Sequence, residues 1–187
     1  LRLPVRVPAL YMSYNVPSLT TADHQDDFYA LTMLGGVLDG GTSARMESNL
    51  VRGQRLAAGL GAGYDGLQRG NGTFTITATP NPAVSLDQLE AAIKAEIEKI
   101  AEQPPSEAEM DRVRAGVLAE QIYQRDSVMG QAMELGTLSV LGLDWRLAGQ
   151  FDDNLEAVTP EQVQQAARKW LVAERSAVAH VIPEGEE

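Results

Sequence analysis

Two neighbouring segments in which side chains alternate strictly place the tightest constraint on the fold. Glycine occupies every second position of residues 58–64, and threonine occupies every second position of residues 73–79. A period of two is typical of strands with one buried face, and Asn71-Gly72 just before the second segment is a turn signal. The pair predicts an antiparallel hairpin whose first strand presents almost bare backbone on one side.

The bare side of residues 58–64 has two interpretations. An extended substrate or a partner chain could lie against it, because no side chain keeps a second backbone away. Alternatively, a helix of the same chain packs closely on it. The alternation leaves both open.

The rest of the chain also divides into strands and helices. Alternation predicts further strands at 10–16 and 176–182, and apolar residues at helical spacing predict helices between them. The first expected helix runs from Asp23 to Gly40-Gly41, and a shorter one from Thr42-Ser43 to about Arg52. Further helix starts are expected at the capping boxes Ser85/Gln88 and Ser106/Glu109, at Leu143-Asp144-Trp145, and at the N-cap Thr159-Pro160.

A helix expected at about 126–140 is rich in small residues. Gly130, Ala132 and Gly136 would permit close approach to a neighbouring element. Met129, Met133 and Leu135 would fill that contact.

This order of elements predicts an α+β fold, a largely antiparallel sheet covered by helices. We expect a single domain over residues 1–187, with residues 1–9 as a linker and residues 184–187 as an acidic tail. No internal repeat is present.

Composition excludes several classes of protein. With 15 basic and 26 acidic residues the formal charge is −11, which repels nucleic acid over most of the surface. No apolar run reaches the roughly 18 residues of a membrane helix, so a soluble protein is expected. The absence of cysteine excludes disulfides, thiolate zinc sites and cysteine nucleophiles.

No catalytic or metal-binding residue is predicted in this chain. The two histidines, His24 and His180, fall on different elements and lack the spacing of a helical zinc pair. Neither a Gly-x-Ser-x-Gly elbow nor a phosphate loop is present, and carboxylate pairs such as Glu96/Glu98 and Asp152/Asp153 fall in runs expected to be solvated. A self-sufficient hydrolase would need a site that the sequence does not contain.

Arg52 is the candidate binding residue. It closes an amphipathic helix just ahead of the glycine-faced strand, where a guanidinium could grip a carbonyl or carboxylate through its bidentate fork. The alternative is a surface arginine paired with a residue such as Glu47.

The run from Gly40 to Ala57, followed by the alternating strand, resembles the C-terminal domain of pitrilysin-type (insulinase-like) zinc peptidases. Similarity to the small bacterial members continues at Arg125-Asp126-Ser127, Gly142-Leu143-Asp144-Trp145, Val158-Thr159-Pro160 and Trp170-Leu171. The resemblance extends from about Tyr11 to Pro183.

This resemblance implies two similar α+β halves closed around a peptide. One half carries an inverted His-x-x-Glu-His zinc site, which this chain lacks. The other half supplies an arginine and a tyrosine that position the peptide. Arg52 falls where that arginine belongs, whereas Ala58 and Gly59 occupy the places of the tyrosine, and the role does not carry over to Tyr64.

The function expected from the resemblance is that of a non-catalytic half of a zinc-dependent peptidase. Its partners would be a peptide substrate and a zinc-bearing half, in the same polypeptide or in a separate subunit. Zinc is expected in that partner half only, and the location in the periplasm or cell envelope. The alternative is a catalytically inert structural or binding subunit derived from the same family.

Overall fold

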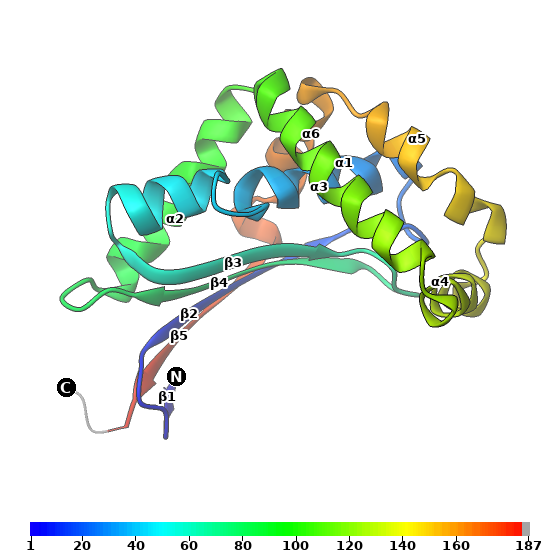
Figure 1. Cartoon of the computed structure of the whole chain (residues 1–187). Coiled ribbons are helices and arrows are strands. Elements are labelled where there is room, and N and C mark those ends of the chain that lie inside the picture. Colours follow the sequence, from blue (N-terminus) through cyan, green and yellow to red (C-terminus); the bar gives the residue numbers. More distant parts are fainter. Residues whose placement is uncertain (185–187) are drawn as a thin grey trace.

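A five-stranded sheet with helices on one face forms the molecule (Figure 1). The computed structural model describes residues 1–184, and for residues 124 and 125 the backbone alone. The strands are β1 (Arg2–Leu3), β2 (Ala9–Val16), β3 (Ala57–Asp65), β4 (Gly72–Pro80) and β5 (Ser176–Pro183). The helices are α1 (Gln25–Asp39), η1 (Glu47–Gly53), α2 (Leu86–Glu102), α3 (Glu107–Arg125), α4 (Val128–Leu141), η2 (Trp145–Gly149), α5 (Phe151–Glu156), α6 (Pro160–Trp170) and η3 (Ala173–Arg175).

The predicted α+β class and the predicted hairpin are both confirmed. The strand order is β1-β5-β2-β4-β3, and every neighbouring pair except β1 and β5 is antiparallel. Gly61 of β3 lies opposite Thr77 of β4, so the glycine and threonine positions share one face of the sheet. The apolar positions of both strands therefore share the other face.

That apolar face and the helices on it enclose the core. The following side chains of β2, β4 and α1 have no solvent-accessible surface: Leu10, Met12, Phe74, Ile76, Leu31 and Leu34. Burying such side chains contributes roughly 1.5–3 kcal/mol each, so this interface holds the helical layer on the sheet.

Three helix starts follow the predicted capping chemistry. Ser85 and Gln88 cap α2, and Thr159 and Gln162 cap α6, each as a complete capping box. At α3, the Ser106 N–H donates to Glu109, and the Glu109 N–H donates to the Ser106 hydroxyl.

The ends of the chain meet at one edge of the sheet. Within residues 1–9, expected to form a linker, Arg2 and Leu3 form β1, which pairs with Ile182 and Pro183. Pairing occurs there because the outer edge of β5 otherwise leaves backbone groups without partners. In the predicted acidic tail, the Glu184 N–H donates to the Leu3 carbonyl, and residues 185–187 lie outside the described part of the chain.

The helix expected to end at about Arg52 has a different geometry. Its last turns form the π-helix η1, in which the Gln54 N–H donates to the Asn49 carbonyl five residues earlier at 2.7 Å. The spacing of apolar side chains indicates a helix but does not distinguish i→i+4 from i→i+5 bonding over so short a segment.

The expected close packing around α4 is wrong. Met129, Met133 and Leu135 are 70%, 63% and 42% exposed, and a Cβ added at Gly136 would meet nothing within 4 Å. Helical spacing identifies an apolar face, but it does not say whether that face has a partner within the same chain. Among the described residues, no helix has the length and apolar character needed to cross a membrane.

Candidate functional site

The sheet face opposite the helices is open. A Cβ added at Gly59 or Gly63 would meet no atom within 4 Å, and Figure 1 shows the helices gathered on the other side of the sheet. The idea that a helix of this chain packs on the glycines is therefore wrong for residues 1–184. The face remains accessible to a second backbone.

A hollow of about 310 Å³ lies on this face. Its lining contains no Asp, Glu, His, Lys or Arg, and its polar side chains are Tyr11, Thr77 and Thr79. Gly59 and Gly61 form its β3 side. Because glycine has no side chain beyond a hydrogen, β3 leaves open space beside these hydroxyl groups.

Sequence reasoning missed Tyr11 as a candidate residue. Tyr11 pairs with Thr77, which pairs with Gly61, so three strands bring the phenol to the hollow, where the residue is 47% exposed. The sequence signal for Tyr11 was its position in β2. It alternates with the buried Leu10 and Met12, so its side chain points to the opposite face of the sheet. To place Tyr11 beside Thr77 and Gly61 also requires the order of the strands in the sheet, which local sequence does not give.

The free edge of β3 offers backbone groups beside the hollow. β3 is the last strand in the sheet order, and the Ala62 N–H points away from β4 and donates to Asp39 Oδ2 at 2.9 Å. Since the backbone groups of alternate residues point the same way, those of Leu60 and Tyr64 also face the free edge. An extended chain could pair at this edge beyond the Asp39 contact.

Arg52, the predicted substrate-binding residue, lies at the end of η1 with its side chain 56% exposed. Its guanidinium donates to the Thr42 carbonyl and to the Ser48 hydroxyl, the latter at 3.0 Å, and lies 3.9 Å from Glu47. The alternative pairing with Glu47 is thus present, and a role in binding substrate stays a prediction.

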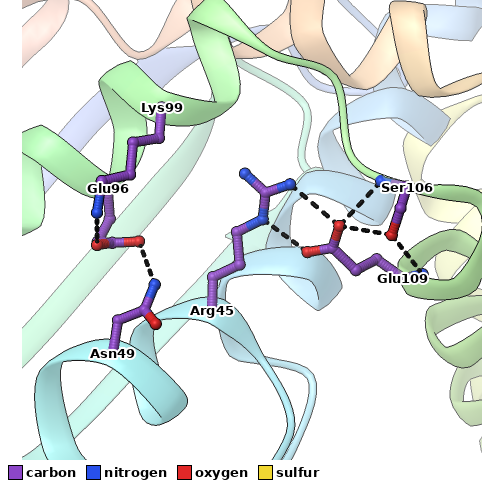
Figure 2. A network of polar contacts seen from close by, with 6 residues as sticks. All are labelled: Arg45, Asn49, Glu96, Lys99, Ser106 and Glu109. Carbon is purple, nitrogen blue, oxygen red and sulfur yellow. Dashed lines mark hydrogen bonds and ion pairs between the residues drawn. The ribbon is translucent and has the colours of Figure 1, made fainter. Parts of the chain in front are cut away.

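Two polar contacts fix η1 against α2 and α3 (Figure 2). Arg45, just before η1, donates twice to the Glu109 carboxylate, at 2.6 and 3.1 Å. Asn49 Nδ2 donates to Glu96 Oε2 at 2.8 Å, while Lys99 contacts Oε1 at 2.5 Å. These contacts therefore attach η1, the helix that carries Arg52, to both α2 and α3.

Of the two carboxylates in this network, Glu96 differs from the sequence expectation, and Glu109 keeps its predicted contact with Ser106. Glu96, expected in a solvated run, is 1% exposed, because Asn49 and Lys99 supply the hydrogen bonds that water would otherwise make. At Glu109, the hydrogen bonds from Arg45 lower the pKa to about 2, assisted by those from Ser106.

Tyr64 has a structural role. Its hydroxyl donates to the Pro17 carbonyl at 2.7 Å, its ring packs edge-on against Phe28, and burial raises its pKa. It lies on the helix side of β3, opposite the glycine face. Its hydroxyl therefore does not reach the open face.

The histidines lie apart. His24 precedes α1, whereas His180 of β5 lies between two carboxylates of α2. Its Nε2 is 2.7 Å from Glu90 and its Nδ1 is 3.7 Å from Asp87. Potential ligand atoms of these three residues lie within 4.8 Å of one another. The two carboxylates approach different ring nitrogens, so the contacts of His180 connect β5 to α2.

Residues 2–117 match the family model described as the peptidase M16 inactive domain. This chain belongs to the peptidase M16 inactive-domain family. The resemblance to the non-zinc half of zinc peptidases is thereby confirmed, and membership implies that the catalytic zinc is not held by this chain. No curated protein matches the chain.

Solved structures share the fold of this M16 domain. A protease from Helicobacter pylori is 23% identical, with a TM-score of 0.85 over 96% of this chain and 42% of its own. An inactive peptidase domain from Bordetella parapertussis is 23% identical, with a TM-score of 0.85 over 100% of this chain and 96% of its own. A peptidase M16 inactive domain from Pseudomonas fluorescens is 18% identical, with a TM-score of 0.84 over 100% of this chain and 43% of its own. The chain thus spans less than half of the first and third of these proteins.

Proposed function

We propose that this chain is the non-catalytic half of a zinc-dependent peptidase. It closes the peptide-binding chamber and positions the substrate for a zinc-bearing partner half, which belongs to the same polypeptide or to a separate subunit. The observation that carries this proposal is the open, glycine-lined sheet face with its hollow. The Helicobacter pylori protease has more than half of its length outside the matched region, which leaves room for a second half.

The chemistry of the hollow suits a peptide backbone. Hydroxyl groups of Tyr11, Thr77 and Thr79 can donate to backbone carbonyls, and Gly59 and Gly61 allow the peptide to approach the sheet closely. Because the lining carries no carboxylate and no basic side chain, these contacts favour an extended backbone over a particular charged side chain.

Arg52 would add a second contact with the peptide. Its exposed guanidinium must exchange its bonds to Thr42 and Ser48 for a substrate carbonyl or carboxylate. Both states offer charge-assisted hydrogen bonds, so the exchange needs little net free energy.

The first test is peptide hydrolysis with a broad quenched-fluorescent library. This chain alone, the zinc-bearing half alone and their mixture are compared, with metal content determined in each. We expect hydrolysis only in the mixture and zinc only in the partner half. Hydrolysis by this chain alone would contradict the proposal.

Two variants test the site within the active mixture. Gly59→Val places a branched side chain at the hollow, where an added Cβ meets nothing within 4 Å, and we expect KM to rise about tenfold with assembly unchanged. The matched control is Gly70→Val, which also has open space at its Cβ position but lies outside the hollow. Arg52→Ala is compared with Arg6→Ala, an exposed arginine in the N-terminal segment. Unchanged kinetics in both Gly59→Val and Arg52→Ala would remove the positioning role.

Two observations favour a second candidate, a catalytically inert structural or binding subunit. Ala58 and Gly59 stand where the family's tyrosine is expected, and Arg52 is bonded to its own helix and the preceding turn. A stable complex with a zinc-loaded half that cleaves no peptide would select this candidate.

We also propose a location in the periplasm or cell envelope, on the basis of the resemblance to small bacterial members. Fractionation of cells with marker enzymes for each compartment tests it. Recovery in the cytoplasmic fraction alone would contradict it.

A further inference from the structure

One face of α4 is apolar and uncovered. Met129, Met133, Gly136 and Val140 follow one another at spacings of four, three and four residues, which places them in one stripe along the helix. The three large side chains are 70%, 63% and 66% exposed, and Gly136 has open space at its Cβ position. We call these four residues the α4 stripe.

The segments on either side of α4 carry further exposed apolar side chains. Ile122 and Tyr123 at the end of α3 are 60% and 77% exposed, and Trp145 at the start of η2 is 61% exposed. Together with the α4 stripe, these side chains expose on the order of 600 Å² of apolar surface, close to the ~800 Å² that each partner contributes to a stable interface.

A cavity of about 370 Å³ adjoins the α4 stripe. Met133 belongs to both, and Phe28, Tyr29, Leu138 and Phe151 line the interior. A large side chain of a partner could enter this cavity, and fully desolvated pockets of this kind carry most of the binding energy at protein interfaces.

The charge around the α4 stripe discriminates between occupants. Residues 117–153 contain six acidic and two basic side chains, a net charge of −4 within a chain of −11. Arg69, which donates to the Val140 carbonyl at 2.9 Å, adds one positive charge and leaves the surroundings negative. A second copy would bring an equally negative rim against this one, whereas a partner with Lys or Arg beside its apolar helix is complementary.

We propose that the α4 stripe and its cavity dock the zinc-bearing half through an apolar helix flanked by basic residues. This inference rests on the proposed function and names the surface that joins the halves. It also gives the small residue at 136 a role, because glycine lets a partner helix approach closely.

The test measures the affinity of this chain for a separately produced zinc-bearing half by calorimetry. Met133→Glu places a carboxylate in the docking surface, and Gly136→Leu blocks close approach, and each position has room for the change. We expect each to weaken binding at least about tenfold. The matched control is Val7→Glu, an equivalent change at a residue that is 54% exposed and far along the chain, which should bind within about twofold of the unchanged chain.

Circular dichroism and thermal unfolding of each variant separate docking from folding. Gly136→Leu should melt no lower than the unchanged chain, because leucine favours a helix interior over glycine. A variant that folds normally and loses binding supports the inference.

Three results would overturn it. These are unchanged binding by Met133→Glu and Gly136→Leu, absence of any complex, or a dimer of this chain alone that Met133→Glu dissociates. Cleavage by the complex is read separately. A complex that forms through α4 but cleaves no peptide would contradict the proposed function and leave this inference standing. An active complex whose affinity is unchanged by both substitutions would contradict this inference and leave the proposed function standing.

Discussion

At the scale of single residues, Glu109 links the stability of the fold to pH. Its carboxylate accepts two bonds from Arg45 and further bonds from Ser106, and these lower its pKa from 4.5 to about 2. A lowered pKa stabilises the folded state above the unfolded value of 4.5, and this contribution disappears as pH falls toward about 2.

We therefore expect Glu109→Gln to reduce the free energy of unfolding by about 2 kcal/mol at pH 7 and by less at pH 3. Urea unfolding at both pH values measures the difference. The matched control is Glu107→Gln on the same helix, where the side chain is 71% exposed and the expected change is below about 0.5 kcal/mol. Equal stability of the two variants at pH 7 would refute the role of Arg45.

At the scale of elements, the π-helix η1 depends on a buried carboxylate. Asn49→Ala removes the donor to Glu96, which is 1% exposed, and should cost about 1–3 kcal/mol. Asn49→Asp replaces that donor with a second negative charge and should cost more, about 3–5 kcal/mol. Thermal unfolding of both variants tests this order.

The control on the same segment is Gln54→Ala, an exposed amide just after η1, with an expected change below about 0.5 kcal/mol. If Asn49→Asp were as stable as Asn49→Ala, Glu96 would not be the constraint on η1. In the active mixture, a shift in KM for Asn49→Ala would further indicate that η1 positions Arg52.

Elements set by local chemistry could be predicted from the sequence. The capping boxes at Ser85 and Thr159 need only residues three positions apart, and the alternation in β3 and β4 follows directly from strand geometry. The predicted position of Arg52 at a helix end was also correct.

Features that depend on distant partners could not be predicted in this way. Burial of Glu96 requires Asn49, 47 positions away in sequence, and the place of Tyr11 beside the hollow requires the order of three strands. The exposure of Met133 depends on the absence of a neighbour within the described chain. The local sequence pattern therefore predicts which faces of the elements are apolar, but it does not predict what covers those faces.

At the scale of the whole molecule, net charge and the neutral hollow should act on different steps of peptide binding. The chain carries 26 acidic and 15 basic residues, but no charged side chain lines the hollow. Long-range attraction accelerates encounter and is screened within about 10 Å at 0.1 M salt, whereas contacts in the hollow set the lifetime of the complex.

We expect a lysine-containing peptide to associate with this chain about tenfold more slowly at 500 mM than at 50 mM salt, with little change in its dissociation rate. Stopped-flow fluorescence measures both rates. The control peptide has glutamate in place of lysine, and its association should accelerate with salt because screening removes repulsion. If salt changed the dissociation rate instead, charged groups would have to contact the bound peptide directly. The peptide would then not lie in the hollow.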